Sequence, residues 1–178
     1  MKNGFTLLEL IITLSILAIL MTVAAPSFSG LLERALIERT TTEFRGLFVQ
    51  AKSEAVMRNS TVYIHTVGLS GTPTKTDNWC IIVSKNLTET SCTAATNIIS
   101  IIQGENLNGL TISRDPNYPK IGLDGIRSWP IFNSGDLEVD FLMFYKDENK
   151  PITMYITMLG RLRTCSVGGE WYGFNQCV

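Results

Sequence analysis

Residues 4–26 read GFTLLELIITLSILAILMTVAAP, and this stretch decides the fold. From Phe5 to Ala25 it is apolar apart from a few hydroxyl side chains and one carboxylate, Glu9. A helix needs about 20 such residues to cross a bilayer. Lys2, on the short leading side, keeps that end cytoplasmic by the positive-inside rule. The sequence therefore predicts a single membrane-spanning helix, with the rest of the chain outside the membrane.

An ordinary secretory signal peptide is the alternative interpretation of this stretch. Such a peptide ends in small residues before its cleavage site, and residues 24–25 and 27–29 could supply them. Glu9 argues against it. A carboxylate costs roughly 2.5–3.5 kcal/mol at the centre of a membrane helix, and intramembrane charges usually have a functional partner. A signal peptide gains nothing from such a residue.

The helical pattern continues beyond Pro26, with apolar side chains at steps of three and four and charged residues between them. Proline lacks an N–H and clashes with the preceding turn, so we expect a kink or a locally extended segment at Pro26. The pattern predicts an amphipathic helix that ends near Asn59-Ser60. Its apolar stripe consists of Phe28, Leu31, Leu32, Ala35, Phe44, Leu47, Phe48, Ala51 and Ala55.

The remainder reads as short β-type runs separated by Gly, Pro, Asn and Asp. A long helix followed only by strands predicts an α+β domain, with the helix laid across an antiparallel sheet. Ser113–Gly125, which contains two prolines, reads as a long surface loop. The expected strands are Thr61–Val67, Trp79–Ser84, Asn97–Ile102, Leu110–Ser113, Ile131–Phe132, Leu137–Tyr145, Ile152–Met158 and Gly160–Cys165.

Four cysteines allow three disulfide connectivities. Proximity favours two local pairs, Cys80–Cys92 and Cys165–Cys177, and disulfides imply an oxidising compartment. No spacing of Cys and His suits a zinc site, so we expect no metal. The single histidine, His65, alternates within a strand pattern and reads as an ordinary strand residue.

Composition and motifs argue against two broad classes of function. With 15 Lys and Arg against 16 Asp and Glu, the formal net charge is −1, which does not suit a dedicated nucleic-acid coat. No local motif suggests a catalytic nucleophile, so we expect neither enzymatic activity nor a cofactor. Asp136, Glu138 and Asp140 would share one strand face; an exposed acidic edge is favoured over a cation site.

The leader GFTLLEL at residues 4–10 resembles the class III leader junction of type IV pilins and type II secretion pseudopilins. The resemblance implies that prepilin peptidase cuts between Gly4 and Phe5 and that the new Phe5 amine is methylated. It also implies that Glu9 offsets the positive N-terminus of a neighbouring subunit, since opposite charges in a low dielectric are better paired than alone. Pro26 matches the proline that breaks this helix in many pilins.

Two segments of the head resemble the GspH/FimT family of minor pilins and minor pseudopilins. AKSEAVMRN at residues 51–59 is similar to the family's A-x-x-E-A-V-x-R segment, and GRLRTC at residues 160–165 is similar to its G-R-x-R segment. The resemblance implies a type IV pilin-like fold. The chain then divides into a cleaved leader (1–4), a transmembrane and filament-core helix (5–27), an amphipathic helix (28–59) and a β-rich head (60–178).

In FimT-like pilins, the G-R-x-R segment is implicated in capturing DNA during natural transformation. The resemblance assigns this contact to Arg161 and Arg163. We add Lys146 and Lys150 as further candidates. On a strand, positions two apart face the same side, so both guanidinium groups would meet one phosphate backbone. The alternative is a solvated face or ion pairs within the domain.

The resemblance thus implies a minor pilin that is inserted in the inner membrane with its N-terminus cytoplasmic and then joins a periplasmic or extracellular filament, near the tip. Its partners would be other pilin subunits, prepilin peptidase and the inner-membrane assembly platform. The alternative is a minor pseudopilin of a type II secretion system, whose further partner would be an exported protein.

Overall fold

A computed structural model of the chain describes residues 6–75, 77–93, 97–107, 109–132 and 135–177, without the side chains of residues 23–27. The predicted cleavage and methylation sites, Gly4 and Phe5, lie outside the described residues. So does the side chain of Pro26, and the expected kink stays a prediction. The chain divides into two compact units, Met1–Leu36 and Ile37–Val178.

The first unit contains the start of helix α1 (Leu7–Met57). Thr6 caps it: its hydroxyl accepts the backbone N–H of Glu9 at 3.3 Å, the first half of a T-x-x-E capping box. Every side chain from residue 6 to 22 is exposed. Among the described residues, no helix combines the length and apolar character needed to cross a membrane. The predicted span includes residues 5 and 23–25, which lie outside the described side chains.

In the second unit, α1 buries one stripe and ends in a defined cap. Asn59 adopts a positive φ of 46°, and the N–H of Ser60 donates to the carbonyl of Ala55 at 3.1 Å. This left-handed cap confirms the predicted helix end. The buried stripe consists of Ile37, Thr40, Thr41, Phe44, Leu47, Phe48, Ala51 and Ala55.

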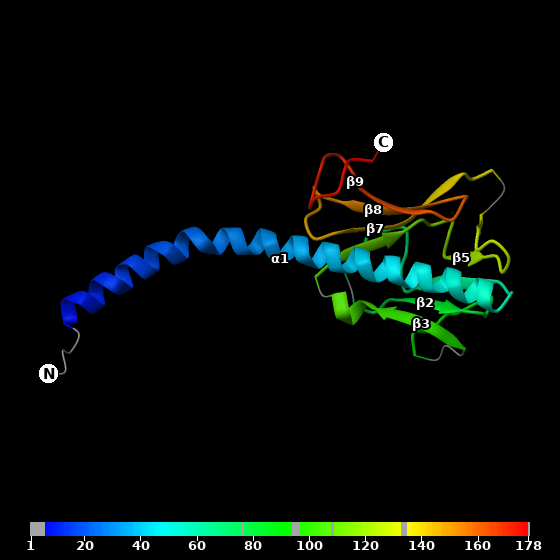
Figure 1. Ribbon diagram of the computed structural model, residues 1–178, viewed down its shortest axis with the longest axis horizontal. Helices are drawn as coiled ribbons and strands as arrows, with labels where there is room; N and C mark the ends of the chain where they lie inside the picture. The colour runs from blue at the N-terminus through cyan, green and yellow to red at the C-terminus, as the bar shows by residue number, and fades with distance from the viewer. Residues whose placement is uncertain (1–5, 76, 94–96, 108, 133–134, 178) are drawn as a thin grey trace. The chain divides into compact units, whose positions relative to one another are not determined.

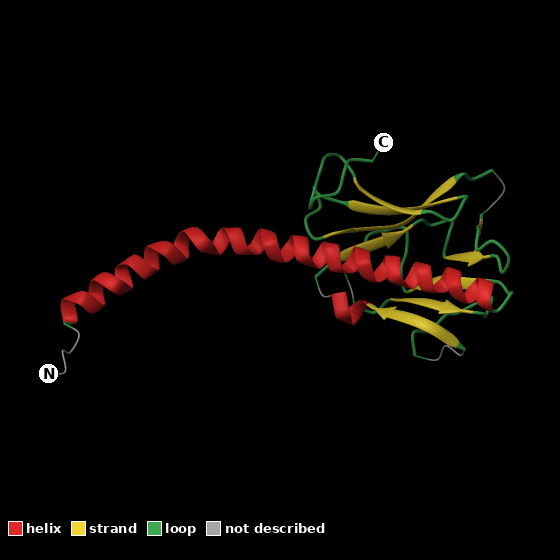
Figure 2. Cartoon of the chain, in the orientation of Figure 1, coloured by secondary structure: helices red, strands yellow, loops and turns green. Residues whose placement is uncertain are grey.

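Two antiparallel sheets complete the second unit, so the fold class is α+β as predicted (Figures 1 and 2). The prediction of one sheet was too simple. The first sheet has the order β3 (Ile98–Gln103), β2 (Cys80–Ser84), β1 (Val62–Val67), β5 (Lys120–Leu123), β6 (Pro130–Ile131). The second has the order β4 (Thr111–Arg114), β7 (Glu138–Tyr145), β8 (Ile152–Thr157), β9 (Leu162–Ser166). A 3-10 helix, η1 (Gly104–Leu107), follows β3.

The prediction that Ser113–Gly125 forms a long surface loop was wrong, because this segment contains strand β5. Ile121 and Leu123 in this strand are fully buried. Strand β1 pairs with β2 on one side and with β5 on the other, so β5 lies inside the sheet. The strand is only four residues long and carries a glycine, and turn residues surround it. Alternation over four residues is too short a signal to compete with those turn residues.

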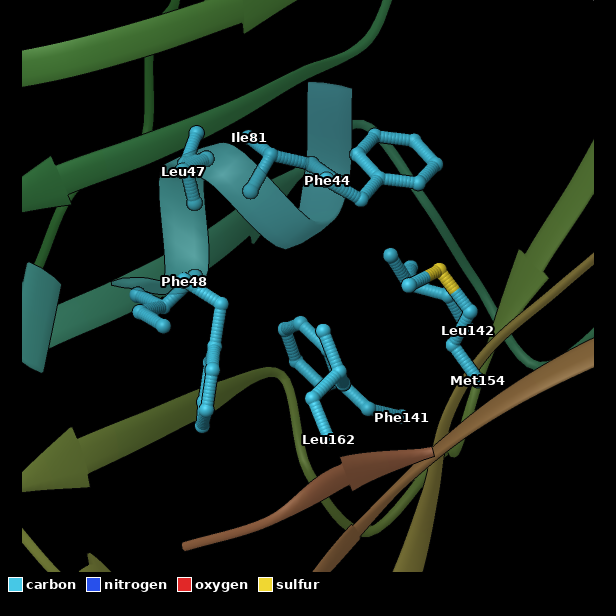
Figure 3. Close-up of a pocket in the computed structure, with 9 residues that line it drawn as sticks. Phe44, Leu47, Phe48, Ile81, Phe141, Leu142, Met154 and Leu162 are labelled. Atoms are coloured by element: carbon cyan, nitrogen blue, oxygen red, sulfur yellow. The ribbon is translucent and has the colours of Figure 1, made fainter. Parts of the chain in front are cut away.

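Phe44 joins the helix to both sheets. Its ring centroid lies 6.5 Å from that of Trp79, beside the first sheet, and 5.9 Å from that of Phe144 in the second. Nine side chains from α1 and both sheets surround a void of about 10 Å³, so the core is filled (Figure 3). Every residue found buried lies between Ile37 and Ser166. The second unit therefore has its own core and is expected to fold alone.

Both predicted disulfides, Cys80–Cys92 and Cys165–Cys177, are present. The second one ties the C-terminal tail to β9. There, the N–H of Cys177 donates to the carbonyl of Ser166, and the N–H of Ser166 donates to the carbonyl of Asn175, both at 2.9 Å. The tail thereby covers the Ser166 end of the outer edge of β9.

Replacing both Cys165 and Cys177 with Ser should lower the free energy of unfolding by roughly 2–4 kcal/mol, because the open chain regains loop entropy. Urea unfolding of the head measures this loss. Hydrogen exchange should show faster exchange at the N–H of Ser166. An unchanged unfolding midpoint together with unchanged exchange would contradict a stapling role.

Candidate functional site

The β8–β9 turn and the start of β9 carry the glycine and the two arginines singled out from the sequence. Gly160 has a φ of 69°, and its N–H donates to the carbonyl of Thr157 at 2.8 Å. A Cβ at this position would lie 3.0 Å from the carbonyl oxygen of Ser128 and 3.1 Å from Nζ of Lys52. Both the left-handed backbone and the close approach therefore call for glycine.

The α1 segment at residues 51–58 packs against this turn. Ala51 and Ala55 are fully buried, while Nζ of Lys52 donates to the carbonyl of Gly160 at 2.9 Å. The hydroxyl of Ser128 donates to the carbonyl of Lys52 at 3.2 Å. The two segments that resemble one family thus meet in space, and Lys52 holds them together. Sequence reasoning missed this role, because nothing local marks a lysine as the donor to a distant turn.

Arg161 and Arg163 both point to solvent. Arg163 lies on β9 and Arg161 directly precedes it, and both are exposed, while Leu162 between them faces the core void. The prediction that they share one side is therefore confirmed. Neither forms an ion pair within 4 Å in the described part of the chain. A hydrogen bond with Tyr155 raises the pKa of Arg163, and the charge of Glu138 adds to the shift.

Two acidic residues of β7, Glu138 and Asp140, lie on the same outer face of the second sheet as Arg163. Tyr155 of β8 pairs with Arg163 on one side and with Asp140 on the other, and Glu138 pairs with Thr157. Glu138 and Asp140 are exposed, as the alternation predicted. Strand β8 lies between the carboxylates on β7 and Arg163 on β9, so two strand spacings, about 10 Å, separate the acidic from the basic residues. This distance is close to the screening length at 0.1 M salt. Any phosphate that reaches the arginines therefore also senses two carboxylates.

Lys146 and Lys150 do not belong to this site, which corrects the expectation that they add to it. They lie in the turn between β7 and β8, beyond the Ile152–Ser166 end of the β8–β9 ladder, whereas Arg161 lies beyond its Ile156–Leu162 end. The ε-ammonium of Lys150 is 3.4 Å from the carboxylate of Asp147. The two lysines are close to the arginines in sequence but not in space, because the β7–β8 turn and the β8–β9 turn lie at opposite ends of β8.

Asp136 accepts a hydrogen bond from the Tyr118 hydroxyl and does not join a ligand cluster. Within the described residues, no group of three or more His, Cys, Asp or Glu side chains could hold a metal ion.

His65 is buried in β1, and its Nε2–H donates to the carbonyl of Asn86 at 2.9 Å. Burial lowers its pKa, and the hydrogen bond to Asn86 only partly offsets this. The histidine thus anchors the loop that the Cys80–Cys92 disulfide closes. This agrees with the prediction that His65 is an ordinary strand residue, and the hydrogen bond to Asn86 adds a structural role to it.

Two family models match the chain. Residues 1–25 match the prokaryotic N-terminal methylation motif, and residues 40–157 match the type II transport protein GspH. The second match covers about two thirds of the chain and ends before Gly160. No curated protein and no solved structure matches the chain.

The free energy of unfolding should fall as the pH drops below about 6.5, the ordinary pKa of histidine. Because the folded pKa of His65 is lowered, the unfolded chain binds the proton more readily. A His65→Gln variant should lose less stability than the wild type between about pH 7.5 and 5.5. Urea unfolding at several pH values measures both slopes; equal slopes would show that His65 does not titrate in this range.

Proposed function

Because the chain belongs to the GspH family of type II transport proteins and carries the prokaryotic N-terminal methylation motif, we propose that it is a minor pilin. In this proposal it inserts in the inner membrane with its N-terminus cytoplasmic. Prepilin peptidase cuts it between Gly4 and Phe5, and the Phe5 amine is methylated. The assembly platform then adds it to a type IV pilus beside other subunits, near the tip.

One observation carries this proposal: helix residues 7–22 expose apolar side chains on every side. Leu7 is 77% exposed, Leu8 69% and Ile19 65%. A helix that is apolar all round needs an apolar environment, which lipid and then the neighbouring helices of a filament would provide. The hydroxyls of Thr13, Ser15 and Thr22 donate to backbone carbonyls of their own helix at 2.7–2.9 Å. They need no water, which suits the same environment.

Glu9 could serve either of two roles: it could cap the start of the helix, or its charge could pair with a neighbouring subunit. The experiment must separate the two. It stands three residues after Thr6, the position at which Glu or Gln completes a capping box. Its side chain is nevertheless exposed, and it carries the single charge of the apolar stretch. In a filament core, that carboxylate would pair with the methylated N-terminal amine of the adjacent subunit.

The second candidate function is a minor pseudopilin of a type II secretion system. The description of the matched family as a type II transport protein favours it. The exposed apolar helix suits both candidates equally. Deletion of the gene separates them: the first expects fewer surface pili with normal protein export, and the second expects the reverse.

DNA contact at Arg161 and Arg163 is part of the pilin proposal. Both guanidinium groups are exposed, and within the described residues neither forms an ion pair, so phosphate can reach them. The nearby carboxylates of Glu138 and Asp140 weaken such a contact. We therefore expect weak binding without sequence preference that declines as salt rises.

Glu9→Ala should abolish incorporation into filaments while membrane insertion persists. Glu9→Gln removes the charge but keeps a capping-box residue, so it should fail as well. Glu9→Asp, which keeps the charge, should restore part of the incorporation. Immunoblots of sheared filaments and of membranes measure both steps. Normal incorporation of the Gln variant would contradict the charge role.

Replacing both Arg161 and Arg163 with Gln should abolish the gel shift of duplex DNA by residues 29–178 at low salt. Replacing Glu138 with Gln and Asp140 with Asn should strengthen binding roughly three- to tenfold, because two repulsive charges disappear.

The matched control replaces Lys146 and Lys150 with Gln, which removes the same charge at the other end of the sheet. It should bind DNA like the wild type. No shift with the wild-type head at low salt, or equal losses from the two double variants, would rule out an arginine site. Thermal melts should show that all variants stay folded.

A further inference from the structure

Three of the four outer sheet edges are short or partly covered, and native proteins use both devices to avoid unwanted strand pairing. Strand β6 is two residues long. The edge of β4 pairs with Thr74, whose N–H donates to the carbonyl of Ile112 at 2.8 Å. The C-terminal tail covers the Ser166 end of β9, where the N–H of Cys177 donates to the carbonyl of Ser166.

The fourth edge, β3, is neither short nor covered at either end by the described residues. Its six residues, IISIIQ, include no charge and no proline, and the strand pairs with β2 on one side. Within the described ranges, no backbone group of Ile98–Gln103 bonds to anything on the other side. The four isoleucines are half-buried or exposed. This edge offers a row of backbone donors and acceptors beside apolar side chains.

A groove runs along this edge, between β3 and the polar face of α1. One hollow of about 320 Å³ is lined by Gln50 and by Ile98 and Ile99. A second of about 370 Å³ is lined by Gln50 and by Ser100 to Ile102. Because both touch Gln50, they follow one another along the strand. Gly46 widens the groove: a Cβ there would meet no atom within 4 Å.

The charges of the groove favour an acidic occupant. Arg39 is paired with Glu43 at 2.9 Å, and Arg58 is paired with Glu54. Lys85 also lines the groove and is exposed, and within the described residues it has no hydrogen bond or ion pair. A second copy of the chain offers no free carboxylate from its own groove, because both glutamates there are already paired with arginines.

We propose that β3 is a docking edge for an extended segment of a partner protein, which adds to the first sheet as a further strand. The backbone of the segment bonds to Ile98–Gln103, as in other cases of β-strand addition. Alternate apolar side chains of the segment pack against the isoleucines and fill the space beside Gly46. An acidic side chain at one end meets Lys85. This proposal does not depend on whether the chain serves a pilus or a secretion system.

The probe is a phage-displayed library of random ten-residue peptides, selected on residues 29–178, which carry the whole core. Selection should enrich peptides with alternating apolar residues and one acidic residue. In fluorescence polarisation, Gly46→Leu should weaken their binding about tenfold or more by filling the groove. Its melting temperature should not fall, because the new side chain meets open space. Bound peptide should slow hydrogen exchange in Ile98–Gln103.

Ile101→Lys should also abolish peptide binding, since a charge on an edge strand opposes pairing. Ile131→Lys is the matched control: it places the same charge on the opposite edge of the same sheet and should leave binding unchanged. Lys85→Gln should weaken only the peptides that carry an acidic residue. Three results would overturn the proposal: no enriched alternating peptide, equal binding by Gly46→Leu, or a dimer of the head that Ile101→Lys dissociates.

Discussion

The head depends on one packing interaction: the stripe of α1 that both sheets share. Phe44 contacts an aromatic ring at each sheet, with centroid distances of 6.5 Å and 5.9 Å, and Ala51 and Ala55 on the same stripe are fully buried. Removing either sheet would expose apolar side chains of this stripe to water. The same helix continues without burial into residues 7–22, so one element provides both the core of the head and an apolar surface that the chain alone cannot cover.

The helix, most of the strands and the disulfides could be predicted from the sequence, because each gives a clear local pattern. The helix end at Asn59, eight of the nine strands to within one or two residues, and both disulfides follow from periodicity, turn residues and proximity. It missed β5, because four residues among prolines and glycines carry too little alternation. It also missed the split into two sheets, since strand order depends on which buried faces meet across the helix. Local patterns do not contain that information.

In the candidate site, too, local patterns predicted some features, while others depended on the register of the strands. The alternation of Arg161 and Arg163 was readable from the sequence, because strands place every second residue on one side. The two acidic residues of β7 were not assigned to the same face, because that requires the register of β7, β8 and β9. Lys146 and Lys150 were grouped with the arginines although the hairpin separates them. The contact between Lys52 and Gly160 joins residues 108 positions apart, beyond the reach of any local rule.

We propose that this chain is a processed, filament-forming subunit whose apolar helix begins at Phe5. Mass spectrometry of the protein purified from its own cells would reveal whether the chain is processed in this way. We predict a mature chain without residues 1–4, beginning with N-methylated Phe5 and with both disulfides intact. A chain that still begins at Met1, or one cut after Ala25 as a secretory signal peptide would be, would contradict the account.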